Sequence, residues 1–157
     1  MDERSEVLNI AAALAVNVDA RRWEALLELF APEVLTDYTS LFGGTPQRQP
    51  REKLVGGWAA FLPGFTRTQH MIGAALVEVE GDSASLAAPV VAWHFCKDPV
   101  PGGGDTWLVG GRYEMQMVRS ADKWRITHLT LAAAWAEGNL DLPRIAGERA
   151  AALERRG

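Results

Sequence analysis

Residues 84–96 read ASLAAPVVAWHFC, and this long run of apolar and aromatic residues is the segment that decides the fold class. Two runs of the same kind follow it, WLVGGRYEMQMV at residues 107–118 and WRITHLTLAAAW at residues 124–135. A shorter alternating segment, residues 72–80, comes before them, and Gly81-Asp82 is typical of a turn. We therefore predict strands that pair in an antiparallel meander.

The predicted strands are longer than the ~5–6 residues of an average strand, so the sheet must curl. Gly110-Gly111 and Pro89 lie where a bulge or a bend can supply that curvature. Residues 97–105, rich in proline and glycine, and residues 119–123 are predicted to be loops. A curled sheet closed by helices forms a cone with a pocket inside.

The first third of the chain has a helical period instead. Apolar residues recur at helical spacing from Val7 to Val18, which predicts a helix over about residues 5–18. A second helix is predicted from Trp23 to about Phe30, where Pro32 closes it. An extended piece at 34–38 and a loop at 43–46 follow, and a third helix is predicted at 51–61, ended by Pro63-Gly64. Helices followed by a meander indicate an α+β protein. We expect one domain over residues 1–157, with residues 142–157 as a charged tail or helix.

Composition and charge narrow the function classes. The chain has 157 residues, 48% of them apolar, and a net charge of -4. A nucleic-acid partner is not expected, because it requires a basic face. No apolar run reaches the ~20 residues of a membrane span, and the N-terminus is too acidic for a signal peptide. Cys96 is the single cysteine, so no internal disulfide can form, and we expect a cytoplasmic protein. We expect no membrane partner.

Several short motifs, in order, resemble the SnoaL-like branch of the nuclear transport factor 2-like (NTF2-like) superfamily. They are Asp19-Ala20-Arg21-Arg22-Trp23-Glu24-Ala25-Leu26, Phe30-Ala31-Pro32-Glu33-Val34, Asp37-Tyr38, Thr68-Gln69-His70, the run from Val90 to His94, and Lys123-Trp124-Arg125-Ile126. The resemblance covers about residues 6–139 and implies an NTF2-like cone, with N-terminal helices packed on a strongly curved antiparallel or mixed sheet that encloses a pocket.

Within that branch the sequence looks most like scytalone dehydratase and its bacterial relatives. The resemblance implies a cofactor-free elimination of water, with catalytic roles on Asp19, Tyr38, His70 and His94. Two positions depart from the pattern. Val18 stands where that family has a second tyrosine, and Arg112 and Glu114 stand near its late-strand serine and asparagine.

His70 is the natural general base, because histidine titrates near neutral pH. Asp19 is the candidate partner that fixes the tautomer of His70 and stabilises its imidazolium form. Each residue also has a structural interpretation. His70 can be a hydrogen-bonded histidine at the start of a strand, and Asp19 can be the N-cap of the second helix.

His94 shares a strand face with small apolar residues, as a pocket wall would. It is the candidate acid that protonates a leaving hydroxyl, and the alternative is a core histidine bonded to a backbone carbonyl. Tyr38 is the candidate donor to a substrate carbonyl or oxyanion, and the alternative is aromatic packing. We expect Asp37 to lie at the surface.

Other polar and aromatic residues are candidates for binding. Trp58 and Trp93, with Trp107 and Trp135, can line the cavity, bury a subunit contact or simply pack in the core. Arg112 and Glu114 can bind a polar substrate group if they point inward, or lie on a solvated outer face. His128 is interpreted as structural or interfacial, on one strand face with Trp124, Ile126 and Thr130. The histidines do not have metal-ligand spacing, so no metal is expected. The resemblance implies that no cofactor is needed either.

These observations lead to three hypotheses. The first is a lyase, a dehydratase acting on a small cyclic or polyketide-like carbonyl compound. The second is a ketosteroid-isomerase-like isomerase or a polyketide cyclase, and the third is a non-catalytic ligand-binding protein. We also expect a homodimer or homotrimer, from apolar side chains predicted on the outer sheet face at Met115, Met117, Leu129 and Leu131.

Overall fold

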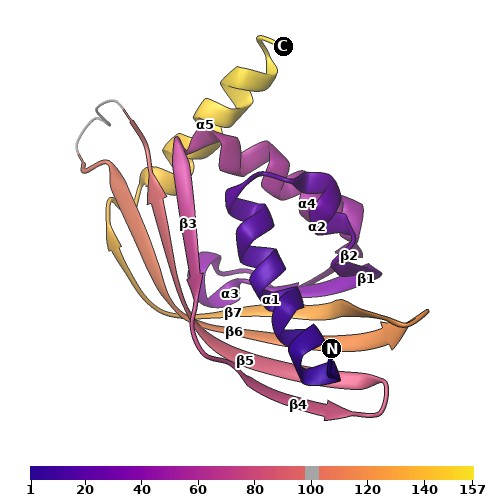
Figure 1. Ribbon diagram of the computed structural model, residues 1–157. Helices are drawn as coiled ribbons and strands as arrows, with labels where there is room; N and C mark the ends of the chain where they lie inside the picture. The colour runs from indigo at the N-terminus through magenta and orange to yellow at the C-terminus, as the bar shows by residue number, and fades with distance from the viewer. Residues whose placement is uncertain (98–102) are drawn as a thin grey trace.

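The structure is a computed structural model that describes residues 1–97 and 103–157. Its centre is a seven-stranded sheet of order β2-β1-β7-β6-β5-β3, with β4 paired to β5 beside β3 (Figure 1). The strands are β1 Phe30–Asp37, β2 Gln47–Pro50, β3 Arg67–Ile72, β4 Leu76–Glu80, β5 Ser83–Phe95, β6 Thr106–Ser120 and β7 Lys123–Gly138. Because β1 pairs with β7 in parallel and the other pairs are antiparallel, the sheet is mixed.

The helices gather on the concave side of this curved sheet (Figure 1). They are α1 Glu3–Asp19, α2 Trp23–Leu27, α3 Thr39–Phe42, α4 Arg51–Phe61, the 3-10 turn η1 Leu62–Gly64 and α5 Leu142–Glu154. The sheet remains open, with β2 and β3 at its edges. The predicted α+β class, with helices packed on a strongly curved sheet, is therefore confirmed. Among the described residues, no helix combines the length and the hydropathy needed to cross a membrane.

Local sequence explains where α1 begins and ends. The side chain of Asp2 accepts a hydrogen bond from the Ser5 amide at 2.9 Å and caps the first turn. Val7, Ala11, Leu14 and Val18 form the buried stripe. Arg21, with φ of 55°, then turns the chain out of the helix in the left-handed conformation. The carboxylate of Asp19 is thereby held at the last position of α1.

The second predicted helix is wrong at its end. It stops at Leu27 instead of Phe30, because Phe30 already belongs to β1 and pairs with Ile126 of β7. Pro32 does not close a helix but lies where the β1–β7 register shifts, a place where a strand tolerates a residue without an amide hydrogen. The helix predicted at 51–61 matches α4. Residues 142–154 form the helix α5, which buries Leu142, Ala146 and Ala150.

Bulges and a change of partner curve the sheet. β7 has an extra residue opposite Gly110/Gly111 and another opposite Gln116/Met117, so the bulge predicted at the two glycines is confirmed. Pro89 lies where the neighbour of β5 changes, since Val90 pairs with β3 and Ala87 with β4. Of the loop predicted at 97–105, residues 98–102 lie outside the described residues.

The apolar outer face predicted at four residues is wrong. Met115, Met117, Leu129 and Leu131 are all buried, at most 7% exposed. On β6 the odd-numbered residues face the core, and the methionines continue the face that begins at Trp107. On β7 the bulge after Ile126 shifts the alternation, so Leu129 points inward and His128 does not share the face of Ile126.

Candidate active site

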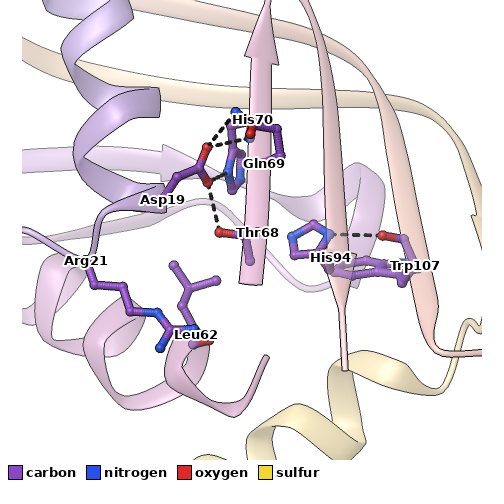
Figure 2. A network of polar contacts seen from close by, with 8 residues as sticks. All are labelled: Asp19, Arg21, Leu62, Thr68, Gln69, His70, His94 and Trp107. Atoms are coloured by element: carbon purple, nitrogen blue, oxygen red, sulfur yellow. Dashed lines mark hydrogen bonds and ion pairs between the residues drawn. The ribbon is translucent and has the colours of Figure 1, made fainter. Parts of the chain in front are cut away.

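The carboxylate of Asp19 is the polar centre of the site (Figure 2). Its Oδ1 accepts hydrogen bonds from Nδ1 of His70 at 2.7 Å and from the Thr68 hydroxyl at 2.8 Å. Its Oδ2 accepts from the backbone amide of His70 at 2.7 Å and from the Gln69 side chain at 3.4 Å. The end of α1 is thus bound to three consecutive residues of β3. Asp19 is not an N-cap, because α2 starts only at Trp23.

The ionised carboxylate determines the protonation of the His70 ring. An ionised carboxylate only accepts hydrogen bonds, so Nδ1 of His70 carries the hydrogen, and in the neutral ring Nε2 has the free lone pair. Partial burial acts to raise the pKa of Asp19, but the hydrogen bonds from His70 and Thr68 outweigh it and hold the pKa below its usual value. The ring of His70 lines the main cavity, so this dyad is arranged to accept a proton there.

His94 of β5 is a second imidazole, with a different environment. It is only 5% exposed, and its Nδ1 lies 3.2 Å from the carbonyl oxygen of Trp107, to which it donates (Figure 2). Its Nε2 is therefore also unprotonated. Burial, reinforced by the nearby His70, lowers the pKa of His94 to about 4. Near neutral pH the lowered pKa leaves the ring uncharged, with Nε2 able to accept a hydrogen bond. The acid role that the sequence predicted for His94 stays a prediction.

The two imidazoles lie close together. Their ring centroids are 5.7 Å apart and the ring planes are nearly perpendicular, at 83°. Phe65, which follows η1, packs against the His94 ring at 4.9 Å, and Trp107 packs on it at 4.4 Å. The guanidinium of Arg21 donates to the Phe65 carbonyl at 2.6 Å, which ties the end of α1 to this aromatic packing. The contact of Nδ1 therefore matches the alternative interpretation of His94 as a histidine bonded to a backbone carbonyl.

Two phenols complete the polar groups of the cavity. Tyr38, between β1 and α3, lines the cavity as the resemblance implied, and Asp37 beside it instead accepts bonds from the Thr39 amide and hydroxyl. Tyr113 of β6 lines it as well and was missed in the sequence. The signal was available, because Trp107, Val109 and Tyr113 share the odd-numbered apolar face of β6.

The cavity has a volume of about 240 Å³ and mostly apolar walls. Apart from His70, His94, Tyr38 and Tyr113, every residue described in its wall is apolar or aromatic. The larger of these include Leu14, Phe42, Trp58, Phe61, Trp107 and Leu131. No lysine, arginine, aspartate or glutamate is among the described lining residues. Such a cavity favours a small, uncharged, ring-shaped ligand.

Of the candidates for binding, Trp58 and Trp107 lie in the wall of the cavity, whereas Trp93, Trp135, Arg112 and Glu114 do not. Trp93 faces the opposite side of the sheet, where it stacks with Phe95 beneath the Arg67 guanidinium. Its neighbours in β5 explain this, because alternation sends Ala92 and His94 inward. Arg112 and Glu114 form an ion pair with each other on the outer face, with their side chains 55% and 45% exposed.

Metal ligation finds no support in the arrangement of side chains. Within residues 1–97 and 103–157, no three histidine, cysteine, aspartate or glutamate side chains lie where they could hold an ion together. Asp19 and His70 are engaged with each other instead. The arrangement of the site is that of an acid–base dyad, a second neutral imidazole and two phenols around an apolar cavity.

Comparison with known proteins adds the family context. The model of the SnoaL-like domain family matches residues 1–130. The uncharacterised protein Rv2910c of Mycobacterium tuberculosis H37Rv is 32% identical over 130 residues, covering 80% of this chain and 82% of that protein. The crystal structure of the Kfla4162 protein of Kribbella flavida superimposes with a TM-score of 0.84 at 28% identity, covering 90% of this chain and 97% of the other.

A proposed scytalone dehydratase of Novosphingobium aromaticivorans DSM 12444 has a similar fold. Its crystal structure superimposes with a TM-score of 0.69 at 20% identity, covering 86% of each chain. At that identity the similarity establishes the fold alone, and the chemistry has to be argued from the side chains of the cavity.

Proposed function

Because the chain belongs to the SnoaL-like domain family, we propose that it is a cofactor-independent dehydratase acting on a small cyclic or polyketide-like carbonyl compound. The observation that carries the proposal is the Asp19–His70 dyad, whose imidazole lines an apolar cavity. A proton acceptor, hydroxyl donors and exclusion of water are the requirements for removing a proton next to a carbonyl.

The first step is proton abstraction. Nε2 of His70 takes a proton from the carbon beside the substrate carbonyl. The electron pair of that C–H bond forms the carbon–carbon double bond of the enolate, and the π pair of the carbonyl moves to its oxygen. Asp19 stabilises the imidazolium that forms, since its carboxylate already accepts the Nδ1 hydrogen. The Tyr38 hydroxyl donates a hydrogen bond to the enolate oxygen.

The second step expels the β-hydroxyl. The enolate reforms its carbonyl, a carbon–carbon double bond forms, and the C–O bond breaks. The departing hydroxide takes the proton held by His70, which releases water and restores the neutral imidazole. His94, neutral and with a bare Nε2, accepts a hydrogen bond from the hydroxyl and orients it for this step.

One imidazole thus both removes a proton from carbon and supplies a proton to oxygen. The hydrogen and the hydroxyl must therefore leave from the same face of the substrate ring. A substrate labelled with deuterium on one face of that carbon tests this point. We expect loss of only the hydrogen that lies on the same side as the hydroxyl.

The test substrate is 3-hydroxy-1-tetralone, a neutral two-ring β-hydroxy ketone. Loss of water and tautomerisation convert it to 1-naphthol, which is fluorescent. We expect His70→Gln to lower turnover by at least about 100-fold. The matched control is His128→Gln, on β7 outside the cavity, which should retain wild-type turnover. Turnover that survives His70→Gln would rule out the proposed role of the dyad.

The isomerase alternative rests on one observation. Burial lowers the pKa of His94, which leaves His70 as the imidazole that holds the abstracted proton, and this proton can return to the substrate carbon instead of the leaving group. A His70-dependent shift of a double bond without release of water would favour that activity. Binding of the ketone without any conversion would instead favour a non-catalytic binding protein.

A further inference from the structure

We infer that Tyr113 is a second catalytic residue, which donates a hydrogen bond to the substrate carbonyl oxygen together with Tyr38. The inference rests on the proposed function, because it assigns the oxygen on which that reaction develops negative charge. It adds a residue from β6 that the sequence motifs did not indicate. The two phenols would then act as a pair of donors for a single oxygen atom.

The first argument for this inference is the position of Tyr113 in the sheet. It pairs with Ala88 of β5 on one side and with Leu131 of β7 on the other. Both neighbours are apolar and both are buried, at 0% and 7% exposed. The Tyr113 hydroxyl is thus the polar group of an otherwise hydrocarbon stretch of wall, and its residue is itself only 7% exposed.

The second argument is the hydrogen-bond pattern of the two phenol hydroxyls. The hydroxyls of Tyr38 and Tyr113 hydrogen-bond each other. Buried hydroxyls normally have a partner, and burying one without a partner costs free energy. A bond between two phenols uses only one of their two hydrogens, and both residues belong to the same cavity wall, so a ligand oxygen in the cavity can accept the other hydrogen and an ionised oxygen can take both.

Electrostatics supports the assignment. Burial raises the pKa of Tyr38 well above its usual range, and the neighbouring phenol of Tyr113 adds to the effect. Burial also raises the pKa of Tyr113 to about 12, with a further contribution from the charge of Asp19. Both hydroxyls therefore keep their hydrogens at neutral pH and act as donors. With no lysine or arginine among the described wall residues, they are the groups that favour a negative oxygen.

The probe for this inference is 1-naphthol, which is small, has two rings, and absorbs differently when its oxygen is ionised. Its ionised oxygen resembles an enolate. We expect wild-type protein to bind it with part of the bound probe ionised near neutral pH. Tyr113→Phe and Tyr38→Phe should each weaken binding of the ionised form by about 10-fold or more, since hydrogen bonds to charged groups are the stronger ones.

The matched control is Trp58→Phe, which alters the same wall without removing a phenol. It should change the affinity for neutral and ionised naphthol alike and leave the ionised fraction of the bound probe unchanged. The inference is overturned if Tyr113→Phe keeps the wild-type affinity and ionised fraction, or if bound naphthol is wholly neutral in the wild-type protein. Thermal melts of each variant verify that it is folded.

A second measurement separates this inference from the proposed function. 1-Tetralone lacks a leaving group, and base-catalysed exchange of its α-hydrogens for deuterium reports enolate formation alone. If Tyr113→Phe slows exchange while no hydroxy ketone is ever dehydrated, the phenol pair stands and the dehydratase proposal fails. If 3-hydroxy-1-tetralone is dehydrated equally fast by Tyr113→Phe, the function stands and the role of Tyr113 fails.

Discussion

At the scale of single residues, the site depends on how the two oxygens of Asp19 are used. One oxygen binds the His70 ring and the Thr68 hydroxyl, and the other binds the His70 backbone amide. The same carboxylate therefore positions both the backbone and the ring of His70. Because an imidazole can rotate or change tautomer, this double contact is what fixes the orientation of the ring and, in the neutral imidazole, places the hydrogen on Nδ1.

Replacing the carboxylate by an amide tests that role. In Asp19→Asn the amide nitrogen donates where the carboxylate accepted, so the Nδ1–H tautomer of His70 is no longer favoured and the imidazolium loses its counter-charge. We expect turnover of 3-hydroxy-1-tetralone to fall by about 100-fold to 10,000-fold. Nitrogen-15 NMR of the His70 ring should report the change of tautomer.

Thr68→Val serves as the matched control, because it removes one hydrogen bond to Asp19 and keeps the carboxylate. We expect a loss of no more than about 10-fold in turnover and an unchanged tautomer, since a neutral hydrogen bond contributes about 1 kcal/mol. An Asp19→Asn variant with wild-type turnover and the wild-type tautomer would contradict the positioning role of the carboxylate.

The buried neutral His94 makes stability depend on pH. Its pKa is about 4 in the folded protein, whereas an unfolded histidine titrates near ~6.5. Between these values the unfolded chain binds a proton that the native chain does not, so the free energy of unfolding falls as the pH drops. The expected loss is on the order of 3 kcal/mol between pH 7 and pH 4. Protonation of Asp19, whose pKa is lowered from 3.8, reduces the free energy of unfolding further, but only at a lower pH.

Urea unfolding as a function of pH measures this effect. His94→Gln removes the titrating group, so we expect a flatter dependence of the free energy of unfolding on pH in that window. His128→Gln, at a half-buried position outside the cavity wall, should keep the wild-type slope. Equal slopes in wild-type protein and His94→Gln would show that another group governs the acid sensitivity.

At the scale of secondary-structure elements, the alternation of apolar and polar residues predicted where the strands lie better than which face of the sheet each residue occupies. β6 and β7 extend the predicted runs by only a few residues, and β5 is shifted by one residue, since it begins at Ser83 and ends at Phe95. The face of His128 could not be predicted, because a bulge in β7 is set by pairing with β6 and leaves no clear local signal. The edge strand β3 was missed for a related reason, since its six residues alternate weakly and its partner β5 lies later in the chain.

The contact between η1 and α5 gives a sharp test of packing. A Cβ at Gly64 would lie 1.7 Å from the carbonyl oxygen of Ala146 in α5, so Gly64→Ala must push two backbone segments apart. We expect the free energy of unfolding to fall by about 2–3 kcal/mol. The His94 environment should change as well, because Phe65 follows Gly64 and packs on that ring.

Gly57→Ala is the matched control for this substitution. A Cβ at Gly57 meets open space on an exposed turn of α4, so alanine should stabilise the helix by about 0.5–1 kcal/mol. Thermal or urea unfolding measures both changes. If the two alanines change stability in the same direction, the close approach of η1 and α5 does not constrain position 64.

At the scale of the whole molecule, the fold collects side chains that are remote along the chain. The site draws on the end of α1, on β3, β5 and β6, and on the segment between β1 and α3. The fold class followed from the change of period after residue 64. The candidate residues Asp19, Tyr38, His70 and His94 followed from the family resemblance, whereas Tyr113 needed the sheet register. What the sequence could not supply was the curvature, which decides which residues share the cavity.

The outer face of the sheet leads to the last prediction, self-association. Met71, Val91 and Trp135 align across β3, β5 and β7, with Gly110 of β6 between them. Met71 is 55% exposed and Trp135 is 42% exposed, and the stacked pair of Trp93 and Phe95 lies on the same side. An apolar row of this kind on an open sheet is typical of a subunit contact, so we expect a homodimer or homotrimer at micromolar concentration.

Sedimentation equilibrium distinguishes these states from a 17.1 kDa monomer. Met71→Lys places a charge in this apolar row, on the edge strand β3, without touching the cavity. We expect it to shift the equilibrium toward monomer by about 10-fold or more in the dissociation constant, about 1.4 kcal/mol or more. Val16→Lys is the matched control, because Val16 is 59% exposed on α1 and lies away from that face. It should leave the association unchanged. A monomeric wild-type protein at micromolar concentration, or equal effects of the two lysines, would contradict a contact through the outer face.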